Sequence, residues 1–408
     1  MRAIRSIRSI RLSACLLALL PAAACALEAG ADANAPSASP DCGAELPAGR
    51  AQPGLPDPFA RADGTRISTA AEWACQRRAL QATAEAQVYG ARGPEPERVE
   101  ARIEGDTIHV NVFHAGREVA FQARLRRPAG QGPHPVMIVV GGVAGVDDAL
   151  LEAEGIARID LDPTAIGAET GTSRERRGAF FELYGEPLHG TGTLMAWAWG
   201  VSRLVDAIAA HDELLLRADA VAVTGCSRYG KGALAAGAFD PRIALTIPIE
   251  SGTGGVPAWR GDGAGGAQPP SSAWGEQPWL GDGFGAYADD PSRLAIDQHA
   301  VLALVAPRGL LVLDNPHVDW LGARHGHLSV LAAAQVYAAL GAPGNIGYHG
   351  DVSEPRHCAW RGEWTAPARD ALRRHLLGAA AGDLPIVAAP GHAARLEPHR
   401  DWTTPVLD

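Results

Sequence analysis

The pattern of apolar and polar residues divides the chain into short strands that alternate with helices. Residues 107–113 and 119–125 alternate apolar with polar side chains on either side of Ala115-Gly116, which predicts a hairpin of two half-buried strands. Continuous apolar runs follow, and such runs are typical of strands that are buried on both faces. These runs lie at 136–140, 156–161, 220–224, 243–249, 309–313 and 346–348.

Helical periodicity fills most of the intervals between these runs. Apolar residues recur at three- and four-residue spacing in 194–210, 232–238, 328–340 and 368–377. Strands that alternate with helices indicate a mostly parallel, doubly wound sheet in a three-layer α/β sandwich. We therefore predict a single α/β domain over residues 51–408, with an antiparallel hairpin at its N-terminal side.

The N-terminal segment has the layout of a secretory signal peptide. Four arginines, at positions 2, 5, 8 and 11, precede an apolar stretch at 12–24, and Ala24-Cys25-Ala26 offers a cleavage site of small residues. We expect residues 1–26 to be removed on export, so that the protein is secreted or periplasmic. Residues 27–50 are expected to form a flexible lead-in, and 378–390 an equally loose segment, whereas Trp402 should pack back onto the domain.

Composition excludes several classes of protein. Hydrophobic residues make up 47% of the 408 residues and charged residues 20%, which is enough for a large core and too apolar for wholesale disorder. The net charge of −10 argues against a nucleic-acid partner. Since no apolar run reaches the roughly 20 residues that cross a bilayer, we expect no membrane span. We expect a monomer.

Export changes how the cysteines are interpreted, because disulfides persist in oxidising compartments. Four cysteines follow the predicted cleavage site: Cys42, Cys75, Cys226 and Cys358. Four cysteines allow three pairings, and their spacing alone does not choose among them.

A serine follows the apolar run 221–224, in Gly225-Cys226-Ser227-Arg228-Tyr229-Gly230-Lys231, and a helix of small residues comes next. This order is typical of a nucleophile elbow, in which a sharp turn lifts the serine hydroxyl clear of the sheet. The helix N-terminus and the amide of Arg228 would then face a developing oxyanion. The spacing Gly-x-Ser-x-x-Gly is one residue longer than that of the usual elbow.

The same segment resembles the signature of the glucuronoyl esterases, carbohydrate esterase family 15. The similarity runs from about residue 42 to the end, and it includes Trp197–Arg203, Phe239–Pro248, Glu250-Ser251-Gly252 and His357-Cys358. It implies an α/β-hydrolase fold and a serine-dependent mechanism that needs no cofactor and no metal. It also implies a substrate: the ester between glucuronic acid of glucuronoxylan, or its 4-O-methyl form, and an alcohol of lignin.

The base should follow the last strand, where His349 and His357 both lie. The resemblance selects His357. If Ser227 and His357 are within hydrogen-bond reach, the adjacent Cys226 and Cys358 can form a disulfide that closes a loop of about 130 residues. Cys42 and Cys75 would then pair by default.

The acid of the triad has more than one candidate. Glu250 follows the strand after the elbow and matches the acid of many members of the resembled family. Most α/β-hydrolases place the acid one strand later, which in this chain points to Asp314 or Asp319. We favour Glu250.

The resemblance also implies a sugar-binding set. Arg228 would reinforce the oxyanion hole, and Lys231, Gln268, Glu276 and Trp320 would bind the substrate. Lys231 is the single lysine among 36 basic residues, which suggests that this position requires a compact ammonium rather than a guanidinium.

Three residues depart from the resembled pattern: Tyr229 replaces a familiar Asn, Ile249 a familiar Gln, and Ala258 the cysteine of fungal members. These changes leave the specificity open. An esterase of the same mechanism could act on another uronate or on small carbohydrate esters. A secreted glycan-binding protein with an inactive triad is the alternative from another class.

Overall fold

The structure is a computed structural model that describes residues 44–47, 49, 51–142, 145–261 and 266–408. The predicted signal peptide, most of the predicted lead-in and Cys42 lie outside the described residues. Leu46, within that lead-in, is buried, and its amide donates a hydrogen bond to Thr83 Oγ1 at 2.8 Å.

A sheet of ten strands runs through the described residues in the order β1-β2-β3-β5-β4-β6-β7-β8-β9-β10. The first three strands form an antiparallel meander, and β5 pairs antiparallel with β3. Every later neighbour is parallel. The strands are β1 Arg98–Glu104, β2 Thr107–His114, β3 Arg117–Arg126, β4 His134–Val140, β5 Ala157–Leu161, β6 Leu216–Cys226, β7 Ile243–Ile249, β8 Gly309–Leu313, β9 Ile346–Gly350 and β10 Ile386–Ala388.

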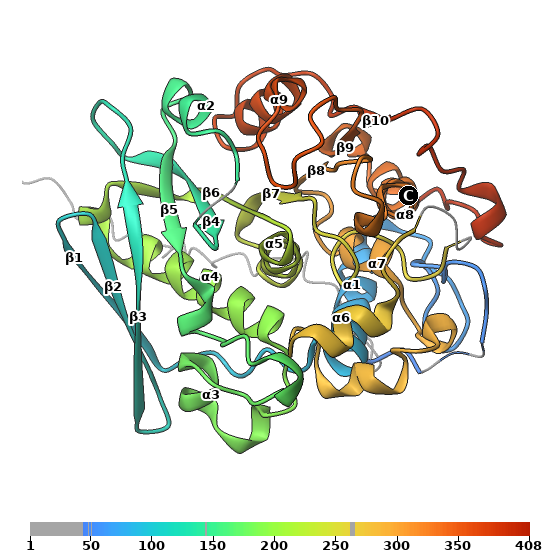
Figure 1. The fold of residues 1–408 in the computed structure, drawn as a ribbon, viewed down its shortest axis with the longest axis horizontal. Helices are drawn as coiled ribbons and strands as arrows, with labels where there is room; N and C mark the ends of the chain where they lie inside the picture. Colours follow the sequence, from blue (N-terminus) through green and yellow to red (C-terminus); the bar gives the residue numbers. More distant parts are fainter. Residues whose placement is uncertain (1–43, 48, 50, 143–144, 262–265) are drawn as a thin grey trace, which may run out of the picture. The chain divides into compact units, whose positions relative to one another are not determined.

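Helices cover both faces of the sheet. They are α1 Ala70–Ala84, α2 Asp148–Ala153, α3 Ala179–Tyr184, α4 Thr193–Ala210, α5 Arg228–Phe239, α6 Pro270–Glu276, α7 Gln298–Ala303, α8 Ala323–Ala339 and α9 Thr365–His375. In Figure 1, α2 and α9 lie along the top of the view, and α4 and α5 lie below them. Across the described part of the chain, no helix is long and apolar enough to cross a membrane.

Successive side chains along the central strands point to opposite faces of the sheet, and this produces the layering. Val136, Ile138 and Val140 of β4 belong to the large core beneath α4 and α5, whereas Met137 and Val139 belong to a second core under α2 and α9. A strand whose two faces both pack on helices must be apolar at every position, which is why these strands read as continuous runs. The predicted three-layer α/β fold with its N-terminal hairpin is confirmed.

The sequence pattern did not predict two of the strands and several of the helices. The edge strand β1 alternates charged residues with Val99, Ala101 and Ile103, and its pattern is weak because one face is only partly buried. Segment 378–390 was expected to be loose throughout, and this is wrong for Ile386–Ala388, which pairs in parallel with Tyr348–Gly350 of β9. The helices α1, α2, α3, α6 and α7 were not predicted either.

The C-terminal tail packs onto the domain as expected. Trp402 is buried, and its indole Nε1 donates a hydrogen bond to the carbonyl of Leu55 at 2.9 Å.

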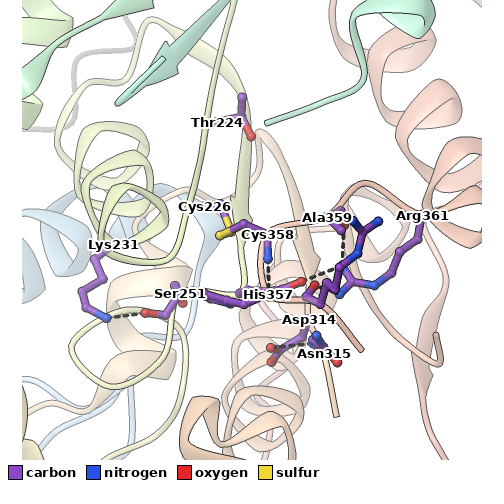
Figure 2. The surroundings of a disulfide bond; sticks show 12 residues. Thr224, Cys226, Lys231, Ser251, Asp314, Asn315, His357, Cys358, Ala359 and Arg361 are labelled. Atoms are coloured by element: carbon purple, nitrogen blue, oxygen red, sulfur yellow. Dashed lines mark hydrogen bonds and ion pairs between the residues drawn. A yellow bond between two sulfur atoms is a disulfide. The ribbon is translucent and has the colours of Figure 1, made fainter. Parts of the chain in front are cut away.

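A disulfide joins the end of β6 to the loop that follows β9 (Figure 2). Cys226 is bonded to Cys358, their Cα atoms are 5.8 Å apart, and 132 positions separate them in the chain. This predicted pairing is confirmed. The pairing of Cys42 with Cys75 stays a prediction, because Cys42 lies outside the described residues.

Removal of this disulfide should destabilise the fold. The bond restricts the unfolded chain over a separation of 132 residues. We therefore expect Cys226→Ala combined with Cys358→Ala to lower the free energy of unfolding by up to about 5 kcal/mol. Urea unfolding without reductant, followed by tryptophan fluorescence, measures the change. Val406→Ala, at a residue that is 84% exposed, is the control and should leave the midpoint unchanged. A double variant with the wild-type midpoint would contradict the prediction.

Candidate active site

Ser227 occupies a strained turn between β6 and α5. Its φ is 60° and its ψ is −129°, in the positive-φ half of the map that a side chain seldom adopts. The Ser227 amide donates to the carbonyl of Ile249 at 2.9 Å, and the residue is partly exposed. Because α5 begins at Arg228, the N-terminal amides of this helix lie beside the hydroxyl.

The two glycines of the motif are required by close backbone approach. A Cβ at Gly225 would lie 2.5 Å from the carbonyl oxygen of Tyr229, and one at Gly230 would lie 2.7 Å from that of Ile249. Any side chain at either position would force the turn apart. The longer spacing of the motif therefore still forms a tight elbow, with its second glycine packed against β7.

Glu250 and His357 form a hydrogen-bonded pair. Glu250 follows β7 directly and its side chain is fully buried, and Oε2 lies 2.6 Å from His357 Nδ1. The same oxygen accepts the amide of Cys358 at 2.9 Å, and Oε1 accepts Arg361 Nη1 at 2.6 Å. A carboxylate in this position fixes the tautomer of the imidazole, so that Nε2 is free to accept a proton.

The other candidate residues make different contacts. Asp314 accepts hydrogen bonds from the amide of Asn315 at 2.9 Å and from the Tyr348 hydroxyl at 3.2 Å. Burial, and next the charge of Glu250, raise the pKa of Asp314 to about 7. Asp319 is exposed. His349 donates through Nε2 to the carbonyl of Asp351 at 3.2 Å. The pair Glu250–His357 is therefore the arrangement that fits an acid and a base.

The same place also holds a group of side chains with metal-ligating atoms. Among the described residues, Cys226, Glu250, His357 and Cys358 bring one such atom each within 4.8 Å of the others. Both sulfurs are already bonded to each other, so they offer no thiolate. The hydrogen-bonded carboxylate and imidazole remain, and this dyad alone offers too few ligands for the usual metal centre.

A pocket opens beside this dyad. It has a volume of about 310 Å³ and is lined by Ser227, Arg228, Lys231, Gln268, Glu276, Trp279 and Trp320. All four predicted substrate-binding residues thus line the same cavity as the serine. The Trp320 and His357 rings meet edge to face, with centroids 5.0 Å apart, so the pocket adjoins the imidazole as well.

Two cations in the pocket have different surroundings. Arg228 is part-exposed and pairs with Glu169 Oε2 at 3.3 Å and with Glu276 Oε1 at 3.9 Å. Lys231 is buried and donates to the carbonyl of Ser251 (Figure 2). Its Nζ lies 5.1 Å from the ring centroid of Trp279. Burial lowers the pKa of Lys231 to about 7; Glu276 and Glu169 oppose this shift, and Arg228 adds to it.

Sequence reasoning missed Glu169, Trp279 and Arg361. Glu169 accepts the Trp279 indole N–H at 2.7 Å while it pairs with Arg228, so it links the pocket wall to the arginine next to Ser227. Trp279 follows Glu276 closely and could have been found from that neighbourhood. Glu169 and Arg361 lie in segments without periodicity, where one charged residue has no distinguishing signal.

Tyr229 and Ala258 depart from the expected motif, and both are packing residues around the pocket. Tyr229 is part-buried against Trp197, with ring centroids 5.6 Å apart. A Cβ at Gly141 would lie 2.2 Å from the Tyr229 ring, so the larger side chain fills a space that only glycine leaves open. Ala258 is buried.

Comparison with known proteins gives consistent matches. A family model described as "Glucuronyl esterase, fungi" matches residues 110–341. The chain is 36% identical over 377 residues to a 4-O-methyl-glucuronoyl methylesterase from Schizophyllum commune, which spans 90% of this chain and 92% of the relative. The glucuronoyl esterase catalytic domain from Hypocrea jecorina has a TM-score of 0.82 at 32% identity, covering 88% of this chain and 98% of that one.

A further solved structure contains a bound ester. It is a mutant glucuronoyl esterase from Sporotrichum thermophile in complex with methyl 4-O-methyl-beta-D-glucopyranuronate, with a TM-score of 0.81 at 29% identity, covering 90% of this chain and 99% of that one. Family model, relatives and fold agree over most of the chain. The chain therefore belongs to the glucuronoyl esterases of carbohydrate esterase family 15, and it is a carboxylic ester hydrolase with the α/β-hydrolase fold.

Proposed function

We propose that this protein hydrolyses esters at the C6 carboxyl of glucuronic acid or its 4-O-methyl form, with Ser227, His357 and Glu250 as the catalytic triad. The observation that carries the proposal is the 2.6 Å contact between Glu250 and His357, beside the strained serine and its pocket. The names of the relatives and the methyl ester bound to one of them support this substrate class.

The chemistry needs one proton acceptor and one site for negative charge. Ser227 Oγ attacks the ester carbonyl while His357 Nε2 takes its proton, and Glu250 stabilises the resulting imidazolium. The oxyanion develops at the N-terminus of α5, where the amides and the Arg228 guanidinium stabilise it. His357 then protonates the departing alcohol, and water releases the uronic acid from Ser227 by the reverse sequence.

The pocket suits a sugar ring more than an aliphatic acyl chain. Trp279 and Trp320 offer flat apolar faces, while Lys231, Gln268 and Glu276 offer donors and acceptors for hydroxyls. Trp320 is 40% exposed and lies at the rim of the pocket, where an incoming polymer would contact it. We infer that the natural substrate is the ester between glucuronoxylan and an alcohol of lignin, and that the enzyme acts as a monomer.

We further propose that residues 1–26 are a signal peptide and that residues 51–408 form a single catalytic domain. The positive start and the apolar stretch of residues 1–26 support export. Export is also required if the substrate lies in the plant cell wall. The enzyme would then act in the periplasm or outside the cell.

Ser227→Ala tests the proposed nucleophile. We expect hydrolysis of benzyl glucuronate to fall by about 10⁴-fold or more, because no other group in the pocket can form the acyl intermediate. The melting temperature should stay near the wild-type value, since the hydroxyl is not part of the core. Benzyl galacturonate and phenyl acetate test the substrate class in parallel. A variant as active as wild type would exclude the mechanism, and equal rates on all three esters would exclude the substrate.

The pH dependence of KM tests the sugar-binding role of Lys231. Because the pKa of Lys231 is lowered to about 7, its ammonium is charged below this pH and neutral above it. Hydrogen bonds from a charged donor are stronger, so KM for benzyl glucuronate should rise about fivefold as the pH rises through 7. Lys231→Met should have a higher KM that does not vary over this range. The same rise in the Met variant would assign the effect to another group.

A further inference from the structure

Arg361 contacts both the acid of the triad and the loop that carries the base. This arginine precedes α9, and its side chain has no solvent exposure, like that of Glu250. Its Nη1 donates to Glu250 Oε1 at 2.6 Å. Figure 2 shows the side chain approaching the disulfide region from the side opposite to Lys231.

The remaining N–H groups of Arg361 bind backbone carbonyls on both sides of His357. Nε donates to Glu354 O at 2.8 Å, and Nη2 donates to Arg356 O at 2.7 Å. Nη1 also donates to Ala359 O at 2.6 Å. The planar guanidinium thus fixes the turn that contains His357 and Cys358 at three points, and lies with Cζ 4.3 Å from the Trp364 ring centroid.

We propose that Arg361 is a positioning residue for the esterase reaction, a planar cation that holds the Glu250 carboxylate and the His357 turn in one fixed arrangement. The proposal rests on the ester hydrolysis proposed above. Glu250 Oε2 binds the base and Oε1 binds Arg361, so the carboxylate can rotate only if both contacts break. A lysine has three donors around one point and cannot reproduce this planar set.

The charges around Arg361 favour this assignment. Four acids face it: Glu250 at the end of β7, Asp314 at the end of β8, and Glu354 and Glu363 on its own segment. The last two are partly exposed to solvent. Burial raises the pKa of Asp314 to about 7, so below neutral pH this carboxyl is protonated. The buried pair is then one guanidinium and one carboxylate, and each neutralises the other.

Arg361→Gln removes the cation and keeps a polar side chain. We expect kcat/KM for benzyl glucuronate at pH 7 to fall about 100-fold, because small misplacements of a catalytic group cost this much. We also expect the acid limb of the pH–rate profile to move up by about one pH unit. Without the guanidinium, the buried carboxylate is neutralised by protonation of the Glu250–His357 pair instead. A residue that only supports the fold would not move this limb.

Arg356→Gln is the matched control, because Arg356 belongs to the same loop and its side chain is 77% exposed. It should keep the wild-type rate and pH profile. Arg361→Lys keeps the charge and loses the planar fork, so kcat should fall about tenfold at unchanged KM. If Arg361→Gln does not fold, the Arg361→Lys variant alone tests the positioning role. A wild-type kcat in Arg361→Lys, or a wild-type acid limb in folded Arg361→Gln, would overturn the proposal.

A measurement without substrate separates this proposal from the proposed function. NMR titration of the histidine rings, with the His357 signal assigned through His357→Asn, should show its midpoint at higher pH in Arg361→Gln than in wild type. If the wild-type enzyme fails to hydrolyse glucuronate esters but this midpoint moves, the function fails and the positioning stands. If hydrolysis is normal and the midpoint stays in place, the positioning fails.

Discussion

The constraint on which the site depends is the burial of one carboxylate. Glu250 is excluded from solvent at the C-terminal end of β7, an inner strand of the sheet, and an ionised carboxyl there is costly unless both oxygens have hydrogen-bond partners. In this chain one oxygen meets the imidazole and the amide of Cys358, and the other meets Arg361. Because both oxygens of Glu250 need hydrogen-bond partners, the position of this carboxylate also determines where His357 must lie.

Backbone strain is concentrated at the same point. Of the six non-glycine residues with positive φ in the described part of the chain, three are Ser227, Glu250 and Cys358, at 60°, 44° and 62°. Each conformation costs about 1–3 kcal/mol unless the surroundings impose it. The disulfide between the neighbours of Ser227 and His357, and the hydrogen bonds of Glu250, supply that restraint. The strained backbone and the disulfide together hold Ser227 in the wall of the pocket and the His357 imidazole beside Trp320 of the same wall.

Much of the fold could be predicted from sequence, because strands buried on both faces leave an unmistakable pattern. The runs at 243–249 and 309–313 coincide with β7 and β8. Strand β10 could not be found this way, since Ile386–Ala388 has three residues and is only partly buried. Helix α1 was missed because its buried side chains include polar ones: Gln76 donates to the carbonyl of Ala60, 16 positions away, and Thr83 donates to the carbonyl of Ala79 within the helix.

The site residues that could be predicted from the sequence lie in local motifs. Those that were missed owe their importance to contacts with residues far away in the sequence. Ser227, Lys231 and His357 stand in short recognisable segments. Glu169 and Arg361 do not, because their importance comes from partners more than 50 positions away: Glu169 pairs with Arg228, and Arg361 with Glu250. The resemblance directed attention to Glu250 rather than Asp314, and the observed contact with His357 supports that choice.

The proposed mechanism requires His357 to activate Ser227 in the folded protein. Reaction with an organophosphorus probe that modifies activated serines, followed by mass spectrometry of the peptides, tests it most directly. We expect a single modification, at Ser227, and a rate that falls about 100-fold or more in His357→Ala. An unmodified Ser227 in folded protein, or an equal rate in the two proteins, would contradict it.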